Sequence, residues 1–175
     1  LFRAIRGAGV RGAGGMRPVV AAGPGPLVWR PLLDVPRSAL LAYARAHCLA
    51  WVDDPSNADS GFSRNFLRNE VLPLVESRFP GAVTGLARMG RLCGEAADML
   101  GELAALDFAA LRLPASLRLG REATLHLTSA RLRNLLRFVL LDAGEAMPDE
   151  DRLREIERQL CNPGAAEGLC LPIGK

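Results

Sequence analysis

The segment WVDDPSNADSGFSRNFLR brings acidic, amide and basic side chains together within a short stretch. Asp53 and Asp54 precede Pro-Ser-Asn, a run of residues that favour a turn and reverse the chain. Beyond the turn, apolar residues recur at helical spacing, which predicts Arg64 and Arg68 on one helix face with Asn65 beside them. Two cations are therefore expected close to two anions.

Two interpretations of this stretch imply different chemistry. In the structural interpretation, the carboxylates of Asp53 and Asp54 pair with the arginines and tie a loop to a helix, since surface ion pairs are common and weak. In the functional interpretation, the same side chains form one wall of a polar pocket. Such a wall suits a phosphate or carboxylate ligand, which arginine binds through two parallel hydrogen bonds. The residues alone leave both interpretations open.

The elements around this stretch are predicted to be helices with a small strand-containing part. The segment LVWRPLL is typical of a short strand, and Asp34 to Ser38 carry a helix start with Pro36 in the first turn. LAWV, ahead of the acidic pair, is strand-like, and this order indicates an α/β part. Residues 82–110 place apolar side chains on one stripe of a helix long enough to join two lobes. Thr128 is a predicted N-cap for the next amphipathic helix, and a charged helix follows Pro148.

A glycine-rich loop, RGAGVRGAGGM, lies near the start of the chain. Gly7, Gly9 and Gly12 match the pattern G-x-G-x-x-G. A dinucleotide fingerprint requires a strand before the loop, whereas a helix-like segment precedes it here, so the match is interpreted as accidental. A loop in which Arg6 and Arg11 approach a phosphate stays open, because backbone amides and arginines can bind anions together.

Length and composition fit one domain or two small ones. The chain has 175 residues, and 49% hydrophobic composition is enough to bury a core. A membrane span needs about eighteen consecutive apolar residues, and neither such a run nor a signal peptide is found, so a cytoplasmic protein is expected. The 4 cysteines are far apart and only 2 histidines are present, which predicts no zinc or other metal site and no disulfide scaffold.

Positive charge is concentrated in the first part of the chain. Lys175 is the only lysine among 22 basic residues, and up to Val75 nine arginines face five acidic residues. Contact with a polyanion is therefore expected in this part. In the second part, Arg131, Arg133 and Arg137 form a basic edge on one predicted helix. This edge fits a solvated helix face as well as contact with an RNA backbone.

Three stretches together resemble the bacterial tRNA(Ile)-lysidine synthetase family. They are RAIRGAGVRGAGGM, then the acidic pair with Pro-Ser-Asn and Arg-Asn-x-x-Arg ahead of Val-Leu-Pro, then LRNLLRFVLLDAG with MPDEDRLREIERQL. The resemblance implies a mainly α fold with a small α/β portion. Residues 1–75 then form the C-terminal part of an N-terminal catalytic domain that is adenine-nucleotide alpha hydrolase-like. Residues 76–110 form a linker helix, and residues 111–175 form a small, mostly helical domain that recognises the tRNA substrate.

The activity that the resemblance implies is the ATP-dependent joining of free lysine to C2 of the wobble cytidine of tRNA(Ile), through an adenylated cytidine. The product is lysidine, the substrate tRNA has a CAU anticodon, and ATP and Mg²⁺ are required; a homodimer is left open. The family motif Ser-Gly-Gly-x-Asp-Ser is not found in the sequence. The chain is therefore expected to be a fragment that lacks the N-terminal pyrophosphate-loop motif, binds no cofactor alone and is inactive alone. The alternative is a non-catalytic helical module that binds RNA or protein.

The resemblance also suggests roles for individual side chains. Adenylation needs arginines for developing phosphate charge, and carboxylates can hold the lysine ammonium group. Arg64 is the catalytic candidate. The candidates for substrate binding are Asp53, Asp54, Asn65, Arg68 and Arg6, and those for tRNA contact are Arg131, Arg133 and Arg137.

Overall fold

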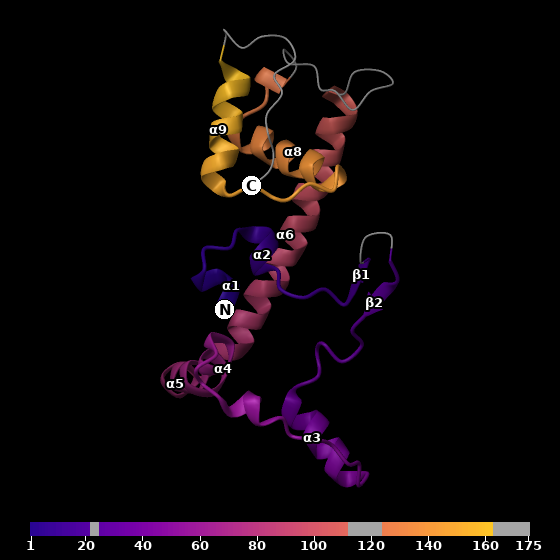
Figure 1. The fold of residues 1–175 in the computed structure, drawn as a ribbon, viewed down its shortest axis with the longest axis vertical. Coiled ribbons are helices and arrows are strands. Elements are labelled where there is room, and N and C mark those ends of the chain that lie inside the picture. Colours follow the sequence, from indigo (N-terminus) through magenta and orange to yellow (C-terminus); the bar gives the residue numbers. More distant parts are fainter. Residues whose placement is uncertain (22–24, 112–123, 163–175) are drawn as a thin grey trace. The chain divides into compact units, whose positions relative to one another are not determined.

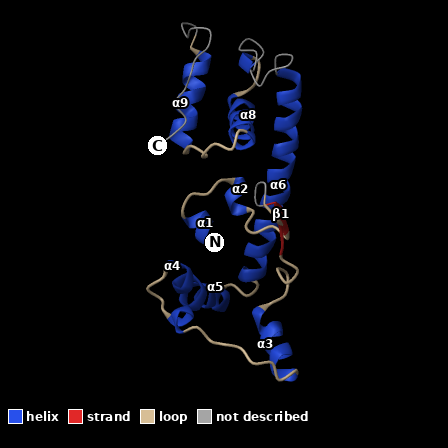
Figure 2. Ribbon diagram, turned by 45° about the vertical axis from the view of Figure 1, so that its right-hand side comes forward, coloured by secondary structure: helices blue, strands red, loops and turns tan. Residues whose placement is uncertain are grey.

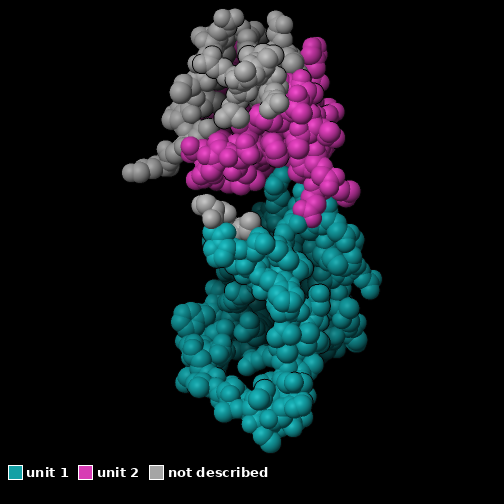
Figure 3. Space-filling view, turned by 90° about the vertical axis from the view of Figure 1, so that its right-hand side faces the viewer, with its two compact units in different colours: residues 1–97 teal, residues 98–175 magenta. Residues whose placement is uncertain are grey.

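The structure is a computed structural model that describes residues 1–21, 25–111 and 124–162. The described residues are mainly helical, and Figure 2 shows strand, in red, only in one small hairpin. The chain divides into two compact units, residues 1–97 (unit 1) and residues 98–175 (unit 2), coloured separately in Figure 3. The predicted fold class, mainly α with a small strand-containing portion, is confirmed. No described helix has the length and apolar character needed to cross a membrane.

Unit 1 begins with two short helices and a hairpin (Figure 1). Helices α1 (Phe2–Ile5) and α2 (Val10–Ala13) are followed by strands β1 (Val19–Ala21) and β2 (Leu27–Trp29), which pair antiparallel. Helix α3 (Arg37–Ala46) follows, as predicted from the helix start around Pro36. The helix-like segment expected before the glycine-rich loop is α1. Within the described residues α1, and not a strand, leads into this loop, so the interpretation of its glycine pattern as an accidental match is consistent with the structure.

Two expected strands differ from the structure. The strand expected from LVWRPLL ends at Trp29, because Pro31 has no amide hydrogen to donate to a ladder. The segment LAWV, residues 49–52, is not a strand at all. A strand needs a neighbour to pair with, and the described residues place none beside this segment.

The acidic pair and the arginines that follow it belong to a run of short helical elements. A 3₁₀ turn, η1 (Pro55–Ala58), leads to helix α4 (Ser63–Phe66), which passes directly into a π-helical turn, η2 (Leu67–Val71). Helix α5 (Leu72–Arg78) continues the run and contains Pro73 in its first turn. Because proline lacks an amide hydrogen, the start of a helix is where it costs least.

The longest helix, α6 (Ala82–Leu111), has 30 residues, and the helix predicted for residues 82–110 is present. Its N-terminus is capped by Glu76 of α5, whose carboxylate accepts hydrogen bonds from the backbone amides of Gly81 at 2.7 Å and Val83 at 2.8 Å. These two bonds hold the pKa of Glu76 below its ordinary value. The domain bounds predicted around this helix, at residues 75 and 110, stay a prediction.

Unit 2 has a compact helical core. Helices α8 (Ser129–Asp142) and α9 (Glu150–Cys161) pack with the second half of α6. The buried apolar residues of this core are Ala104, Leu132, Leu135, Leu140, Leu153 and Ile156. Thr128 caps α8 by accepting a hydrogen bond from the Arg131 amide, as predicted. Buried Asn134 donates to the Leu100 carbonyl at 2.7 Å, which fixes α8 against α6.

Candidate functional site

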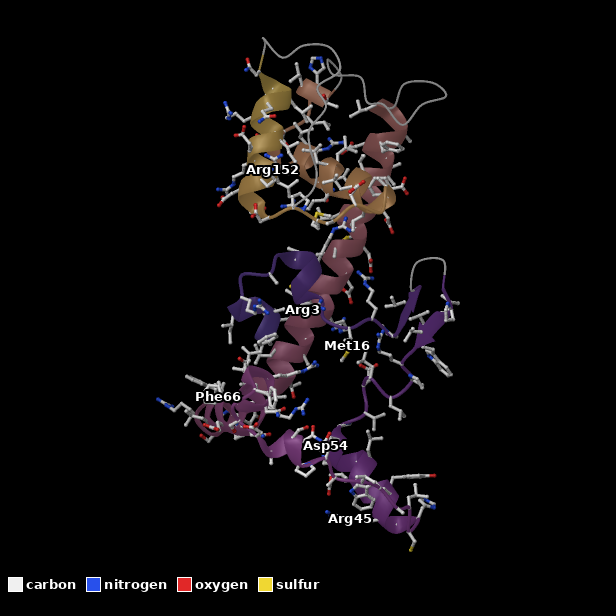
Figure 4. The ribbon with its side chains drawn as sticks, in the orientation of Figure 1. Arg3, Met16, Arg45, Asp54, Phe66 and Arg152 are labelled. Carbon is white, nitrogen blue, oxygen red and sulfur yellow. The ribbon has the colours of Figure 1, made fainter. Side chains whose placement is uncertain are left out.

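A cavity of about 320 Å³ lies in unit 1 and is lined by α1, α2 with the loop after it, α4 and α6. Figure 4 labels Arg3 and Met16 where α1 and this loop run along α6. The lining residues are Leu1, Phe2, Arg3, Ala4, Gly12, Ala13, Gly15, Met16, Arg64, Leu86, Met89 and Gly90. Apolar and glycine residues therefore form most of the wall, and the charged groups in it are two arginines without any carboxylate.

Arg64, the catalytic candidate from the sequence, is one of these two arginines. It lies on α4, which places it against the first turns of α6. Within the described residues, no hydrogen bond or ion pair engages its guanidinium. A guanidinium without an acidic partner at a cavity wall is available to bind an anion from solution.

Arg3, the second arginine of the cavity, was not singled out by sequence reasoning. It too has no hydrogen-bond or ion-pair partner among the residues that the structure describes. Arg6, which was predicted to bind substrate, instead stacks its guanidinium over the Phe2 ring at 5.5 Å and does not line the cavity. Arg3 could have been identified from the sequence by its position on the short helix directly before the glycine-rich loop. The substrate-binding role of Arg6 stays a prediction.

The glycine-rich loop packs against α6 through backbone contacts. A Cβ atom added to Gly14 would lie 3.0 Å from the Cα and 3.1 Å from the nitrogen of Gly94. Gly15, next in the chain, has a φ of +73°, a conformation that other residues rarely adopt. A Cβ on Gly90 would meet the Ala13 carbonyl oxygen at 3.5 Å. These glycines therefore bring the loop close enough to α6 to form a shared cavity wall.

The acidic pair does not form the expected network with the arginines. Asp54 accepts a hydrogen bond from the Ser56 amide at 2.9 Å, which caps η1 and lowers the pKa of Asp54. Asp53 is exposed, and no ion pair joins either carboxylate to Arg64 or Arg68 in the described part of the chain. The interpretation as an Asp/Arg network is therefore wrong. A carboxylate satisfied by its own turn gains little from an exposed ion pair.

Asparagine side chains tie the loop to the helical run instead. The Asn65 side chain donates to the carbonyl oxygens of Ser56 at 2.7 Å and Asp59 at 3.0 Å. One turn later, the Asn69 side chain donates to the Asn57 carbonyl oxygen at 3.1 Å. Asn65 was predicted to contact substrate, and this role stays a prediction. Its described partners show that it also fixes the position of α4, and therefore of the neighbouring arginine.

Arg64 and Arg68 do not line the same cavity wall. Arg68 lies in the π-helical turn η2, where the Leu72 amide donates to the carbonyl of Leu67, five residues back. The wider turn shifts side chains that an α-helix would stack four residues apart. Arg64 lines the cavity and Arg68 does not, so the two arginines do not share this cavity wall, and their common helix face stays a prediction. A substrate-binding role for Arg68 stays a prediction.

The three arginines predicted to contact tRNA are all engaged in ion pairs within unit 2. The pairs are Arg131 with Asp107, Arg133 with Glu157 at 2.6 Å and Arg137 with Glu150 at 2.5 Å. Arg131 donates two hydrogen bonds to Asp107, whose side chain is only 6% exposed, and these bonds raise the pKa of Arg131. These pairs link α8 to α6 and α9. Contact with tRNA stays a prediction for all three.

Two family models match the chain. The model described as a PP-loop domain matches residues 1–75, and the model described as a TilS substrate binding domain matches residues 119–175. The two matches define the class: this is a PP-loop protein with a TilS substrate-binding domain. More particularly, the chain belongs to the tRNA(Ile)-lysidine synthase family.

Similar proteins named tRNA(Ile)-lysidine synthase cover most of the chain. The protein from Aromatoleum aromaticum is 47% identical over 174 residues, which are 99% of this chain and 40% of the relative. The protein from Pseudomonas aeruginosa is 47% identical over 160 residues, which are 86% of this chain and 36% of the relative. The protein from Nitrosomonas europaea is 43% identical over 164 residues, with 93% and 35% coverage. The chain thus spans about two fifths or less of the length of these relatives.

One expectation about the first part of the chain needs correction. The chain was expected to lack the N-terminal pyrophosphate-loop part, because Ser-Gly-Gly-x-Asp-Ser is not found in it. Residues 1–75 nevertheless match the PP-loop domain model, so this description was wrong. A short motif is a small part of a domain, and many positions outside it also characterise the domain. The expected inactivity of the chain alone rested on the same motif and is not maintained.

Proposed function

We propose that this chain is part of an ATP-dependent ligase that joins free lysine to C2 of the wobble cytidine of tRNA(Ile) with a CAU anticodon, forming lysidine. Family membership supports the proposal, because the relatives carry this name. The structural observation that carries it is Arg64, which belongs to the Arg-Asn-x-x-Arg stretch of the resemblance and lines a cavity with no carboxylate in its lining. Such a cavity suits phosphate groups.

Arg64 is proposed to meet the negative charge that develops on the phosphates during adenylation. A guanidinium donates two parallel hydrogen bonds to phosphate oxygens, and a donor already held in position stabilises developing charge without reorganising. The asparagine ties to Ser56 and Asp59 hold α4 against its loop and so supply this fixed position. Asp53, exposed and unpaired among the described residues, is proposed to hold the ammonium group of lysine.

The cavity suits the phosphate groups of ATP but not the Mg²⁺ ion that accompanies them. Its two arginines fit phosphate oxygens, but its lining contains no carboxylate that could bind a divalent cation. In phosphate-transfer sites, Mg²⁺ commonly keeps several waters and binds through one or two carboxylates together with the substrate phosphates. The chain's own role at this wall is therefore proposed to be phosphate binding, with Mg²⁺ arriving together with the nucleotide.

The alternative, a non-catalytic helical module that binds RNA or protein, is less well supported. It accounts for the helical core of unit 2 but gives no role to the arginine-containing cavity of unit 1. A homodimer stays a prediction for either function. Lysidine formation decides between the two functions directly.

The test uses a full-length chimera, in which this chain replaces the matching segment of the Aromatoleum aromaticum relative. Transcribed tRNA(Ile) is incubated with ATP, Mg²⁺ and labelled lysine, and incorporation of label is measured for the chimera and for the unchanged relative. We expect lysine incorporation by both proteins. A chimera that melts at the temperature of the relative but incorporates no lysine would rule out the ligase function for this chain.

A further inference from the structure

The cavity of unit 1 collects two like charges from separate elements. Arg3 comes from α1 and Arg64 from α4, some sixty positions further along the chain. Neither guanidinium has an acidic partner among the described residues, and no carboxylate lines the cavity. Two cations at one cavity wall repel each other, and a bound anion relieves this repulsion.

In unit 2, three arginines are paired with carboxylates, in contrast to the two arginines of the cavity. Arg131, Arg133 and Arg137 each meet a carboxylate from a neighbouring helix, which satisfies their charge within the fold. Arg6 is close to Arg3 in the chain, but its guanidinium stacks over the Phe2 ring. The two cavity arginines differ from these others because they line a cavity and have neither a carboxylate nor a ring partner among the described residues.

We propose that Arg3 and Arg64 form a clamp that binds one phosphate group of a substrate from two sides. This inference rests on the proposed function and adds Arg3 to its binding residues. The planar fork of one arginine already occupies both oxygens of a carboxylate, whereas a tetrahedral phosphate offers further oxygens to a second fork. Gly15, whose Cβ position has no atom within 4 Å, leaves room for a phosphate to approach the backbone. The phosphate belongs either to an adenine nucleotide or to the RNA backbone.

The test uses the full-length chimera with Arg3→Gln, Arg64→Gln and both changes together. Arg45→Gln is the matched control, because Arg45 is exposed on α3, outside the cavity lining, and its loss removes the same charge (Figure 4). Binding of MgATP is measured by titration calorimetry, and binding of tRNA(Ile) transcript at several salt concentrations. Melting temperatures identify any variant that does not fold, and Arg3→Lys, which keeps the charge but loses the fork, then replaces Arg3→Gln.

If the phosphate belongs to the nucleotide, each single change weakens MgATP binding about tenfold or more and leaves tRNA binding unchanged. If it belongs to RNA, tRNA binding weakens instead, and its salt dependence falls by about one phosphate contact. In both cases the double change costs less than the product of the single changes, because the two arginines share one ligand. Affinities for MgATP and tRNA that stay within about twofold of the Arg45→Gln control would overturn the clamp. A chimera that makes no lysidine but still shows the Arg3 effect on MgATP binding would leave the clamp standing and reject the proposed reaction.

Discussion

Asn65 is joined to Ser56 by a hydrogen bond of 2.7 Å from the side-chain amide to the backbone carbonyl oxygen. A second bond from the same amide nitrogen reaches the Asp59 carbonyl at 3.0 Å. The helix that carries Arg64 is therefore fastened to its loop by a neutral amide with two donors. The charge of the neighbouring Arg64 is not used in this tie, which leaves its guanidinium available to a ligand.

Replacing Asn65 is expected to disturb the position of α4. Asn65→Asp has the same shape but no donor, and its carboxylate faces two carbonyl oxygens, so it is expected to lower stability by more than the roughly 1 kcal/mol of an ordinary hydrogen bond. Urea unfolding of the chain measures this change. Asn69→Asp, which loses a single bond to Asn57, is the matched control and is expected to cost less. Equal stability of Asn65→Asp and the unchanged chain would contradict a positioning role.

Arg64→Lys separates phosphate binding from a structural role. Lysine keeps the charge but loses the fork, so turnover of the full-length chimera is expected to fall roughly 100-fold, as when one preorganised donor is removed. Stability is expected to change by about 1 kcal/mol or less, since the guanidinium has no partner among the described residues. Lysine incorporation into tRNA(Ile) and the melting temperature are measured together. Arg68→Lys, in the π-helical turn outside the cavity, is expected to have a smaller effect, and near-normal turnover by Arg64→Lys would remove Arg64 from the catalytic site.

The backbone contact between Gly14 and Gly94 predicts opposite results for two alanine substitutions. Gly14 has an ordinary φ of −58°, but its new Cβ would meet the Gly94 backbone at 3.0 Å, so Gly14→Ala is expected to cost about 1–3 kcal/mol. A Cβ on Gly94 would have only ordinary contacts of 3.8 Å and 4.0 Å. Gly94→Ala is therefore expected to be neutral or to stabilise α6 by up to about 1 kcal/mol. Denaturant unfolding of both variants checks the contact, and equal effects would contradict it.

The Glu76 cap of α6 predicts a pH-dependent contribution to stability. The pKa of Glu76 in the folded chain lies below its ordinary value of 4.5, because the charged form accepts hydrogen bonds from the Val83 and Gly81 amides. The contribution is therefore present in full above pH 4.5 and is lost as pH falls through the lower pKa of the folded state. Glu76→Gln is expected to lower the melting temperature at pH 7 and to approach the unchanged chain near pH 3.

The control for this prediction is Glu70→Gln. The carboxylate of Glu70 is exposed and has no partner in the part of the chain that the structure describes. Its replacement is expected to leave the melting temperature nearly unchanged at either pH. A difference between Glu76→Gln and the unchanged chain that stays constant from pH 7 to pH 3 would contradict the capping role.

Loss of the Arg131–Asp107 pair is expected to destabilise the fold more than loss of an exposed ion pair. Removing Arg131 leaves a carboxylate that is 6% exposed without its cation, so Arg131→Gln is expected to lower the melting temperature clearly. Arg154→Gln is the control, because Arg154 and Glu150 pair at 3.5 Å with side chains that are 64% and 47% exposed. Adding Asp107→Asn to Arg131→Gln is expected to restore much of the loss. If Arg131 also contacts tRNA, this double variant remains weaker in tRNA binding, and unchanged binding would reject the predicted contact.

Local patterns in the sequence predicted much of the fold, and interactions between distant segments were harder to predict. Apolar periodicity located the long helix α6, and a single threonine located the start of α8, because both depend on residues within a few turns. The partner of Arg131 lies 24 positions away and belongs to another helix. Its side chain was predicted to lie on a basic edge, either solvated or in contact with RNA, because the sequence does not show which helix faces are in contact.

The candidate site was predicted in part for the same reason. Arg64 was identified from its own motif, whereas Arg3 enters the site only because α1 lies against α6. The sequence placed Asn65 next to substrate without indicating that its amide reaches back to Ser56. Turn-forming residues predicted the reversal at η1, but which side chains would hold the turn depended on the path of the chain after it.

The π-helical turn η2 has the form that a one-residue insertion leaves in an α-helix. The wide turn takes up this extra residue locally, so α4 and α5 keep nearly the orientation that a continuous α-helix would give them. Deleting Asn69 is therefore expected to remove the bulge and leave Arg64 at the cavity wall, while α5 keeps its cap on α6. The aim of Arg64 thus depends on how the helix takes up a change in length at this point, and not on the number of residues alone.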